Sequence, residues 1–273
     1  MKTVLTIAGS DPSGGAGIQA DIKTITVHGL YAMSAVTALT VQNTLGVSAV
    51  EAVSTSLVAQ QIDCVFEDIR PDAIKIGMLG NAGIIRTVAE RLSFYRAESV
   101  VLDPVMVSTS GRKLLDQEAV ELLRDMLFPL AQVITPNLPE AEALCGFSVQ
   151  NEMEMERAAR LLSERSGVAV LLKGGHLTGR ADDLLYEGRE ARWLSGERVS
   201  NPNTHGTGCT LSSAIACHLA QGEDLLESVR QAKSYLTSTL KAGLNLGKGN
   251  GPLNHMYAGC AAQYKNTHSA AHP

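Results

Sequence analysis

The sequence predicts an α/β fold: a three-layer α/β/α sandwich with a central, mostly parallel sheet. Two observations predict it. Short runs rich in apolar and β-branched residues alternate with longer segments of helical periodicity. Most of the short runs also end in polar or glycine-bearing segments, as strands that lead to a ligand-binding edge do. With 273 residues, 45% of them hydrophobic and 19% charged, the chain is long enough to bury a sizeable core. We expect one domain over residues 1–257 and a flexible tail over 258–273.

The strand candidates are short apolar runs, too brief for helices. In chain order they are residues 3–8, 34–42, 73–77, 99–103, 132–136 and 168–173. Residues 183–194, DLLYEGREARWL, predict a hairpin at the edge of the sheet with Gly188 near its turn. Apolar strands between amphipathic helices indicate a parallel sheet that is covered on both faces.

The segments between these strands predict helices, because their apolar residues recur at helical spacing. The apolar faces are Ile18, Ile22 and Ile25; then Ile84, Ile85, Val88 and Leu92; then Ala119, Leu122, Leu123 and Met126.

Composition excludes several classes of function. A net charge of −5 provides no basic surface for nucleic acid. No apolar run reaches the roughly 18 residues that a membrane span needs, and the first residues do not resemble a signal peptide. We therefore expect a cytoplasmic protein with small-molecule ligands and no nucleic-acid or membrane partner. The cysteines are odd in number and widely spaced, which favours neither a disulfide framework nor a zinc cluster: Cys64, Cys145, Cys209, Cys217 and Cys260.

One cysteine has a chemically suggestive setting. In THGTGCTLSSAIACHLA, residues 204–220, Gly206 and Gly208 form a glycine-rich turn, and Cys209 stands where a helix begins. The helical spacing is carried by Leu211, Ile215 and Leu219. A helix N-terminus favours anions and lowers the pKa of a thiol placed there. The segment therefore predicts an anion site and a proton acceptor in one turn.

The familiar nucleotide-binding signatures do not account for the site. A Walker loop, G-x-x-x-x-G-K-[ST], occurs nowhere in the chain. Residues 15–20 nearly match the dinucleotide fingerprint, but they stand several residues beyond the first strand. The acidic ribose partner is also missing, because the second strand ends in Gln42 and Asn43.

A different set of side chains converges at the predicted sheet edge. Asp103 ends the fourth strand and Lys173 ends the sixth, while Asn137 and Glu140 follow the fifth. Glu140 alone is explained equally well as a charge that complements a helix dipole. Together these groups supply the carboxylates, the amine and the amide donors that a metal-chelated triphosphate requires.

Several single residues keep two interpretations. His176 and His205 each stand alone in a glycine-bearing loop, which favours loop hydrogen bonding over metal ligation. Met78, after the third strand, is typical of a core residue or pocket wall. Asp11 and Asp21 fit ligand contacts as well as a solvated turn and a helix start.

Seven motifs in order resemble the hydroxymethylpyrimidine/phosphomethylpyrimidine kinases of thiamin biosynthesis, within the ribokinase superfamily. They are AGSDPSGGAGIQADIKT, TALTVQNT, KIGML, VLDPVM, TPNLPEAEAL, LLKGGH and NTHGTGCTLSSA. The resemblance runs from Leu5 to about His255. It implies a ribokinase-like fold with a sheet of eight or more strands, usually as a homodimer. It also implies ATP-dependent phosphorylation of 4-amino-5-hydroxymethyl-2-methylpyrimidine and then of its monophosphate, with Mg²⁺.

The resemblance also implies roles for individual residues. Gln42 matches the pyrimidine-binding glutamine, surrounded by Asp21, Met78 and Val105. The residues that match the nucleotide and Mg²⁺ side are Asn137, Glu140 and Lys173, and Lys173 is also a candidate catalytic residue. Asp103, placed near them by the strand ends, is the second candidate metal carboxylate. Gly206, Thr207 and Gly208 match the anion hole, with Thr207 also on the nucleotide. Cys209 stands where most sugar kinases of the superfamily carry an aspartate, which makes it the candidate catalytic base.

Three alternatives remain open. A related branch of these enzymes phosphorylates pyridoxal by means of a second cysteine in the loop after D-P-V-M, where this chain has Ser108 and Ser110. A sugar kinase is less consistent with Gln42 and Met78, which suit a flat heterocycle. A non-catalytic sensor of ATP or a pyrimidine belongs to another class of function.

Overall fold

The computed structural model describes residues 1–107, 114–175 and 182–257. Three expectations lie outside the described residues: the tail over 258–273, the Ser108 and Ser110 loop, and the hydrogen bonding of His176. No helix in the described part of the chain is both long and apolar enough to cross a bilayer.

The centre of the molecule is a nine-stranded sheet in the order β3-β2-β1-β4-β5-β6-β7-β8-β9. The strands are β1 (Thr3–Ser10), β2 (Tyr31–Asn43), β3 (Gly46–Ala52), β4 (Ala73–Ile76), β5 (Val100–Leu102), β6 (Val133–Ile134), β7 (Ala169–Leu172), β8 (Asp183–Glu187) and β9 (Glu190–Leu194). The pairs from β2 to β7 are parallel. β3, β8 and β9 add antiparallel edges. All six predicted strands are confirmed, with ends that shift by a few residues.

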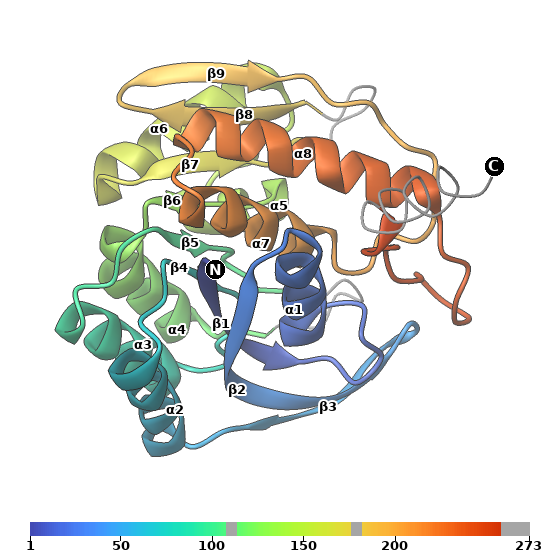
Figure 1. Ribbon diagram of the computed structural model, residues 1–273. Helices are drawn as coiled ribbons and strands as arrows, with labels where there is room; N and C mark the ends of the chain where they lie inside the picture. The colour runs from blue at the N-terminus through green and yellow to red at the C-terminus, as the bar shows by residue number, and fades with distance from the viewer. Residues whose placement is uncertain (108–113, 176–181, 258–273) are drawn as a thin grey trace, which may run out of the picture.

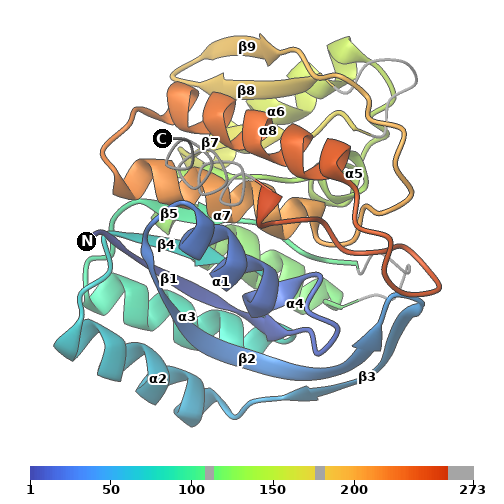
Figure 2. The same cartoon turned by 45° about the vertical axis from the view of Figure 1, so that its right-hand side comes forward.

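Helices cover both faces of this sheet. They are α1 (Gly17–Val27), α2 (Thr55–Asp68), α3 (Ala82–Phe94), α4 (Gln117–Leu122), α5 (Leu138–Cys145), α6 (Glu152–Ser166), α7 (Thr207–Ala220) and α8 (Leu225–Ala242). Figures 1 and 2 show α1, α7 and α8 on one side, with α2 and α3 on the other. Neighbouring residues of β1 point to opposite faces of the sheet and pack in different hydrophobic cores. Val4 belongs to the core with α7 and α8, and Leu5 to the core with α2 and α3. The predicted three-layer α/β/α sandwich is confirmed.

One predicted helical face is partly wrong. Ala119 and Leu123 are buried as expected, but Leu127 is fully buried and Met126 only partly. The reason is a π-helical turn over Leu123–Leu127 that follows α4 directly. A π turn holds more residues than an α turn, so it rotates the buried face by about one position.

The hairpin at the far edge is confirmed. β8 and β9 are joined by Gly188 and Arg189, whose φ angles of 56° and 74° are both left-handed. A two-residue turn with two positive φ angles matches the right-handed twist of the paired strands. Glycine adopts such an angle without the steric cost that Arg189 bears at the second turn position.

The opposite edge carries a feature that the sequence did not reveal. β3 pairs with the end of β2, and together they curve beyond the rest of the sheet (Figure 2). The side chains of β3 are exposed or only partly buried, so its sequence lacks the apolar run that marks the other strands. This extension carries Gln42 over the carboxyl ends of the central strands.

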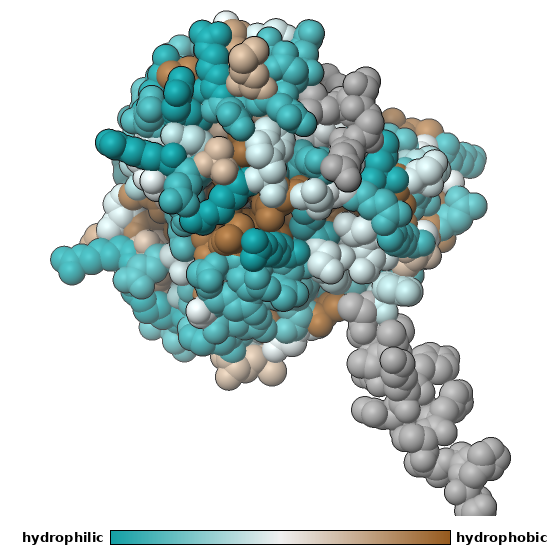
Figure 3. All heavy atoms as spheres, turned by 90° about the horizontal axis from the view of Figure 1, so that it is seen from above, coloured by the Kyte–Doolittle hydropathy of each residue, from teal (hydrophilic) through white to brown (hydrophobic). Residues whose placement is uncertain are grey.

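Polar side chains cover most of the face seen in Figure 3, and apolar ones gather in a band across its middle. This distribution accords with the ordinary charged fraction of the sequence.

Candidate active site

A cavity of about 670 Å³ opens at the carboxyl ends of the central strands. It is lined by all but one of the predicted site residues: Gln42, Met78, Asp103, Val105, Asn137, Glu140, Lys173, Gly206, Thr207, Gly208 and Cys209. The exception is Asp21. Parallel strands bring these residues together because their carboxyl ends share one edge of the sheet.

The glycine turn before α7 is built as the sequence predicts. Gly206 is the N-cap with φ 86°, and a side chain there would collide with the Gly15 carbonyl. In the described residues no side chain caps the first turn of α7. The start of α7, with the positive end of its dipole, therefore lines the cavity, and the Thr207 N–H donates to the Thr204 carbonyl at 3.3 Å. Such a helix start suits an anion.

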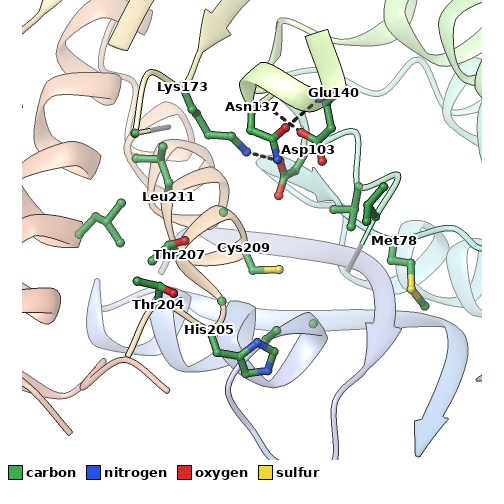
Figure 4. A pocket seen from close by; sticks show the side chains of 18 of the residues that line it. Met78, Asp103, Asn137, Glu140, Lys173, Thr204, His205, Thr207, Cys209 and Leu211 are labelled. Atoms are coloured by element: carbon green, nitrogen blue, oxygen red, sulfur yellow. Dashed lines mark hydrogen bonds and ion pairs between the residues drawn. The ribbon is translucent and has the colours of Figure 1, made fainter. Parts of the chain in front are cut away.

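The prediction of a lowered thiol pKa at Cys209 is wrong. Cys209 points into the cavity between Thr207 and Met78 (Figure 4). Burial raises the pKa of the thiol to about 11, although the nearby Lys75 ammonium and a hydrogen bond from the Gly17 backbone oppose that rise. Loss of solvation is the largest cause of the shift, and the charges of Asp21 and Asp103 add to it. In the ligand-free protein the thiol is protonated at neutral pH.

Asp21 lies beneath the cavity and does not line it, which corrects its predicted place beside the substrate. It is fully buried. Both of its carboxylate oxygens accept from Lys75 Nζ, at 3.0 and 2.9 Å. The hydroxyls of Thr6 and Ser213 also donate to it, at 2.6 and 2.8 Å. Asp21 thus ties α1, α7 and the sheet together.

Sequence reasoning missed Lys75. It stands in the apolar strand β4, and both it and its partner Asp21 are 0% exposed. The signal that could have found it is the single lysine inside the apolar run AIKI, because a charge in a buried strand needs a buried partner.

The nucleotide side of the cavity contains a second ion pair. Lys173 Nζ lies 2.9 Å from Asp103 Oδ1, and the Thr135 hydroxyl donates to the same oxygen at 3.1 Å. Figure 4 shows Lys173 reaching towards Asp103 beside Asn137 and Glu140. The predicted convergence of the carboxylates and the amine is therefore present.

Glu140 lies in the first turn of α5, where its charge complements the helix dipole, and it also remains a candidate metal ligand. It forms a capping box with Asn137: the Asn137 N–H donates to Glu140 Oε2 at 2.8 Å, and the Glu140 N–H donates to Asn137 Oδ1 at 2.9 Å. Burial raises the pKa of Glu140 to about 7; the Lys173 charge opposes the rise, and the Asp103 charge adds to it. Negative charge is thus crowded where a cation would relieve it.

The donor set restricts the kind of metal site. The described residues contain no group of three or more His, Cys, Asp or Glu side chains placed to hold a metal ion. Mg²⁺ often keeps several waters and binds through one or two carboxylates together with substrate phosphates. Asp103 and Glu140 fit a hydrated Mg²⁺ that arrives with a nucleotide, and they do not form an all-protein cage.

The other end of the cavity carries Gln42, Met78 and Val105. Met78 is half-buried and forms part of the wall, as predicted. Its backbone carbonyl accepts from the Thr37 hydroxyl at 2.6 Å. These side chains present one carboxamide among apolar neighbours, which suits a flat polar heterocycle.

His205 and Asp11 are structural parts of this end. His205 makes loop hydrogen bonds as predicted, with Nε2 at 2.8 Å from Asp11 Oδ2. Asp11 is 2% exposed, so its interpretation as a solvated turn residue is wrong. Although burial opposes it, hydrogen bonds from His205, Ser13 and Ala16 lower the pKa of Asp11 to about 2.

Comparison with known proteins agrees with this geometry. A family model described as phosphomethylpyrimidine kinase matches residues 11–254. The thiamine biosynthesis bifunctional protein ThiED of Geobacter sulfurreducens is 49% identical over 257 residues, which cover 94% of this chain and 52% of that protein. The chain thus spans about half the length of that relative.

Two further relatives extend over nearly their whole length. The hydroxymethylpyrimidine/phosphomethylpyrimidine kinase of Synechococcus elongatus is 45% identical, over 94% of this chain and 98% of its own. The solved structure of a Bacillus subtilis pyridoxal kinase, as an ADP complex, superposes with a TM-score of 0.88 at 36% identity, over 95% of this chain and 99% of that one.

The fold is therefore ribokinase-like, and the chain is a kinase. With the family model covering residues 11–254 and a cavity edge built from the matching motifs, this chain belongs to the phosphomethylpyrimidine kinase family.

Proposed function

We propose that this chain transfers the γ-phosphoryl group of ATP to the hydroxymethyl group of 4-amino-5-hydroxymethyl-2-methylpyrimidine, and then to the resulting monophosphate. In the first step the alcohol oxygen bonds to phosphorus, the bond to ADP breaks and the hydroxyl proton is released. In the second step a phosphate oxygen of the monophosphate is the acceptor. The observation that carries the proposal is that the start of α7 lies in one cavity with Gln42 and with Asn137 and Lys173.

The acceptor side is assigned to Gln42, Met78 and Val105. A carboxamide provides one donor and one acceptor to an aminopyrimidine edge. Met78 and Val105 form an apolar wall beside it, and this wall accepts a flat ring.

The phosphoryl group is assigned to the turn at residues 206–209. The backbone N–H groups of Gly206 and Gly208 would face the negative charge on the moving group, together with that of Thr207 once it leaves the Thr204 carbonyl, and the helix dipole favours the charge there. Positioning and charge neutralisation dominate phosphoryl transfer because its transition state is loose.

Cys209 is assigned as the acceptor of the hydroxyl proton. Because burial raises the pKa of the thiol to about 11, only a small thiolate fraction exists at neutral pH in the free protein. An alcohol needs little deprotonation before a loose transition state, so proton transfer comes late and a small fraction suffices.

The nucleotide side is assigned to Asn137, Lys173 and Thr207. Asp103 and Glu140 would hold a hydrated Mg²⁺, which supplies charge neutralisation for the phosphates when it is bound. Lys173, already paired with Asp103, is placed to turn its ammonium towards phosphate oxygens.

The test is an ATP-consumption assay over a panel of alcohols with Mg²⁺. ATP turnover that depends on the hydroxymethylpyrimidine supports the proposal. Ligand binding without turnover would identify a sensor instead.

Pyridoxal kinase activity is the second candidate, because the Bacillus subtilis pyridoxal kinase superposes at a TM-score of 0.88. Ser108 and Ser110 lack the thiol chemistry towards an aldehyde that the related branch uses, so we propose pyridoxal as a side activity at most.

The proposal includes a homodimer and a cytoplasmic location. Exposed apolar side chains on β2 and in the turn that follows it support the dimer: Leu39, Val41 and Leu45 are 56%, 60% and 65% exposed. Light scattering of the purified protein measures the oligomeric state directly.

A further inference from the structure

Three segments that are distant in sequence meet at one imidazole nitrogen. His205 Nε2 lies 2.8 Å from Asp11 Oδ2 and 3.2 Å from the side-chain amide of Gln42. His205 is 6% exposed and Asp11 2% exposed, so water does not substitute for these contacts. The next residue along the chain, Gly206, is the N-cap of α7.

The proton on this nitrogen is fixed by Asp11. The Asp11 carboxylate accepts from the backbone N–H groups of Ser13, Gly15 and Ala16, which hold it ionised. A carboxylate oxygen only accepts hydrogen bonds. A contact of 2.8 Å between it and His205 Nε2 therefore requires a hydrogen on Nε2.

That hydrogen determines which end of the Gln42 carboxamide faces His205. The structure assigns the amide nitrogen to the contact with Nε2. Nε2 carries a hydrogen that it gives to Asp11 and has no lone pair left, so an amide nitrogen there would set two donors against each other. The amide oxygen must therefore lie on the imidazole side, where it can share the same hydrogen. The neighbouring contact leads to the same result. The Thr40 hydroxyl lies 3.2 Å from the Gln42 atom assigned as Oε1, but it gives its one hydrogen to the Ser10 carbonyl at 2.7 Å and so meets the amide as an acceptor. The amide nitrogen therefore faces Thr40.

We propose that His205, held by Asp11, is a positioning residue that fixes the Gln42 carboxamide with its oxygen towards the imidazole and its nitrogen towards Thr40. This inference rests on the proposed function, in which Gln42 reads the acceptor ring. The remaining lone pair and the remaining N–H of the amide then meet the ligand in one fixed order. Heteroaromatic alcohols with an amino donor beside a ring-nitrogen acceptor fit this order, and rings with the reversed order do not.

The same contact joins recognition of the acceptor to the transfer site. His205, which contacts Gln42, is followed directly by Gly206, the N-cap of α7, so it borders the transfer site as well. Asp11 extends the connection to residues 13–16, whose N–H groups it accepts.

The test uses two substitutions of His205 whose side chains differ in length. The side-chain amide nitrogen of His205→Gln reaches the position of Nε2, whereas that of His205→Asn reaches only the position of Nδ1. We expect His205→Asn to raise KM for the aminopyrimidine alcohol about tenfold, the loss of one orienting hydrogen bond. The KM for ATP should change little, and His205→Gln should recover most of the loss in KM. The melting temperature of His205→Asn should fall, because the buried Asp11 carboxylate loses a donor. Equal effects of both variants, or a loss in kcat alone, would overturn the proposal.

A double-mutant cycle with Gln42→Met separates positioning from general damage. If His205 acts through Gln42, then His205→Asn changes KM little once Gln42 is already replaced. Additive effects on KM would show that His205 acts independently and would refute the proposal.

A spectroscopic readout keeps this inference distinct from the proposed function. In the free protein, the side-chain amide resonances of Gln42, assigned by comparison with Gln42→Met, should shift in His205→Asn and return in His205→Gln. If the wild-type protein does not phosphorylate the pyrimidine alcohol, the proposed function is wrong, and these resonances still test the positioning role. Unchanged Gln42 resonances in His205→Asn would contradict it.

Discussion

Replacement of Glu140 by glutamine should stabilise the ligand-free protein at alkaline pH. Glu140 is 5% exposed and lies near the Asp103 carboxylate, so its ionised form is disfavoured in the folded state. Glutamine keeps the shape of the side chain and a capping oxygen but carries no charge. The gain should therefore depend on pH, as a packing effect would not.

The magnitude follows from the shift in pKa. Burial raises the pKa of Glu140 from 4.5 to about 7, and each unit corresponds to about 1.4 kcal/mol. A raised carboxyl pKa means that the folded state binds the proton more tightly than the unfolded state. The resulting stability is fully present below pH 4.5 and is lost as the pH rises to about 7. Between pH 5 and pH 8 the wild-type protein should thus lose about 2 to 3 kcal/mol relative to Glu140→Gln.

Urea denaturation of both proteins at pH 5 and pH 8, without nucleotide or metal, measures this difference. The comparison cancels contributions that both proteins share, such as the lowered pKa of His255. Asn137→Ala, which removes the capping oxygen without removing the Glu140 charge, is the matched control and should leave the pH dependence in place. A stability difference between Glu140→Gln and wild type that is equal at the two pH values would refute the reasoning.

Four further predictions concern catalysis, the buried ion pair and the choice of substrate. Cys209→Ala should lower kcat at least about tenfold with little change in KM, since a general base typically contributes about 10² to 10⁴-fold; unchanged turnover would reduce the thiol to a packing role. In the wild-type enzyme kcat should rise from pH 7 to pH 9, because burial places the pKa of the Cys209 thiol at about 11, and a flat profile would argue against a thiolate base. Lys75→Met should destabilise the protein by about 3 to 5 kcal/mol in urea denaturation, because it leaves the Asp21 charge buried without a partner; adding Asp21→Asn should recover part of the loss, and no recovery would contradict the pairing. Finally, kcat/KM should favour the hydroxymethylpyrimidine over pyridoxal, and a clear preference for pyridoxal would reverse the assignment.

Local patterns in the sequence were sufficient to predict the architecture and most of the site. Apolar runs marked the central strands because both faces of a parallel sheet are buried, so those runs carry no polar alternation. Because parallel strands end at one edge, the sequence also predicted that Asp103, Lys173 and the Gly206 turn would converge. β3 escaped detection because its side chains remain largely exposed and leave no apolar signature.

Buried ion pairs and the pKa values of buried groups arise only when distant segments pack together, so the sequence did not predict them. Asp21 and Lys75 are 54 positions apart, and Asp11 and His205 are 194 apart, so no local pattern could pair them. The tertiary structure likewise decided the pKa of Cys209. Its place at a helix start is readable from the sequence, but the burial that raises the pKa comes from the elements packed around it. The chain by itself determined which groups stand at the strand ends, and packing decided which of them meet the cavity and in which state of charge.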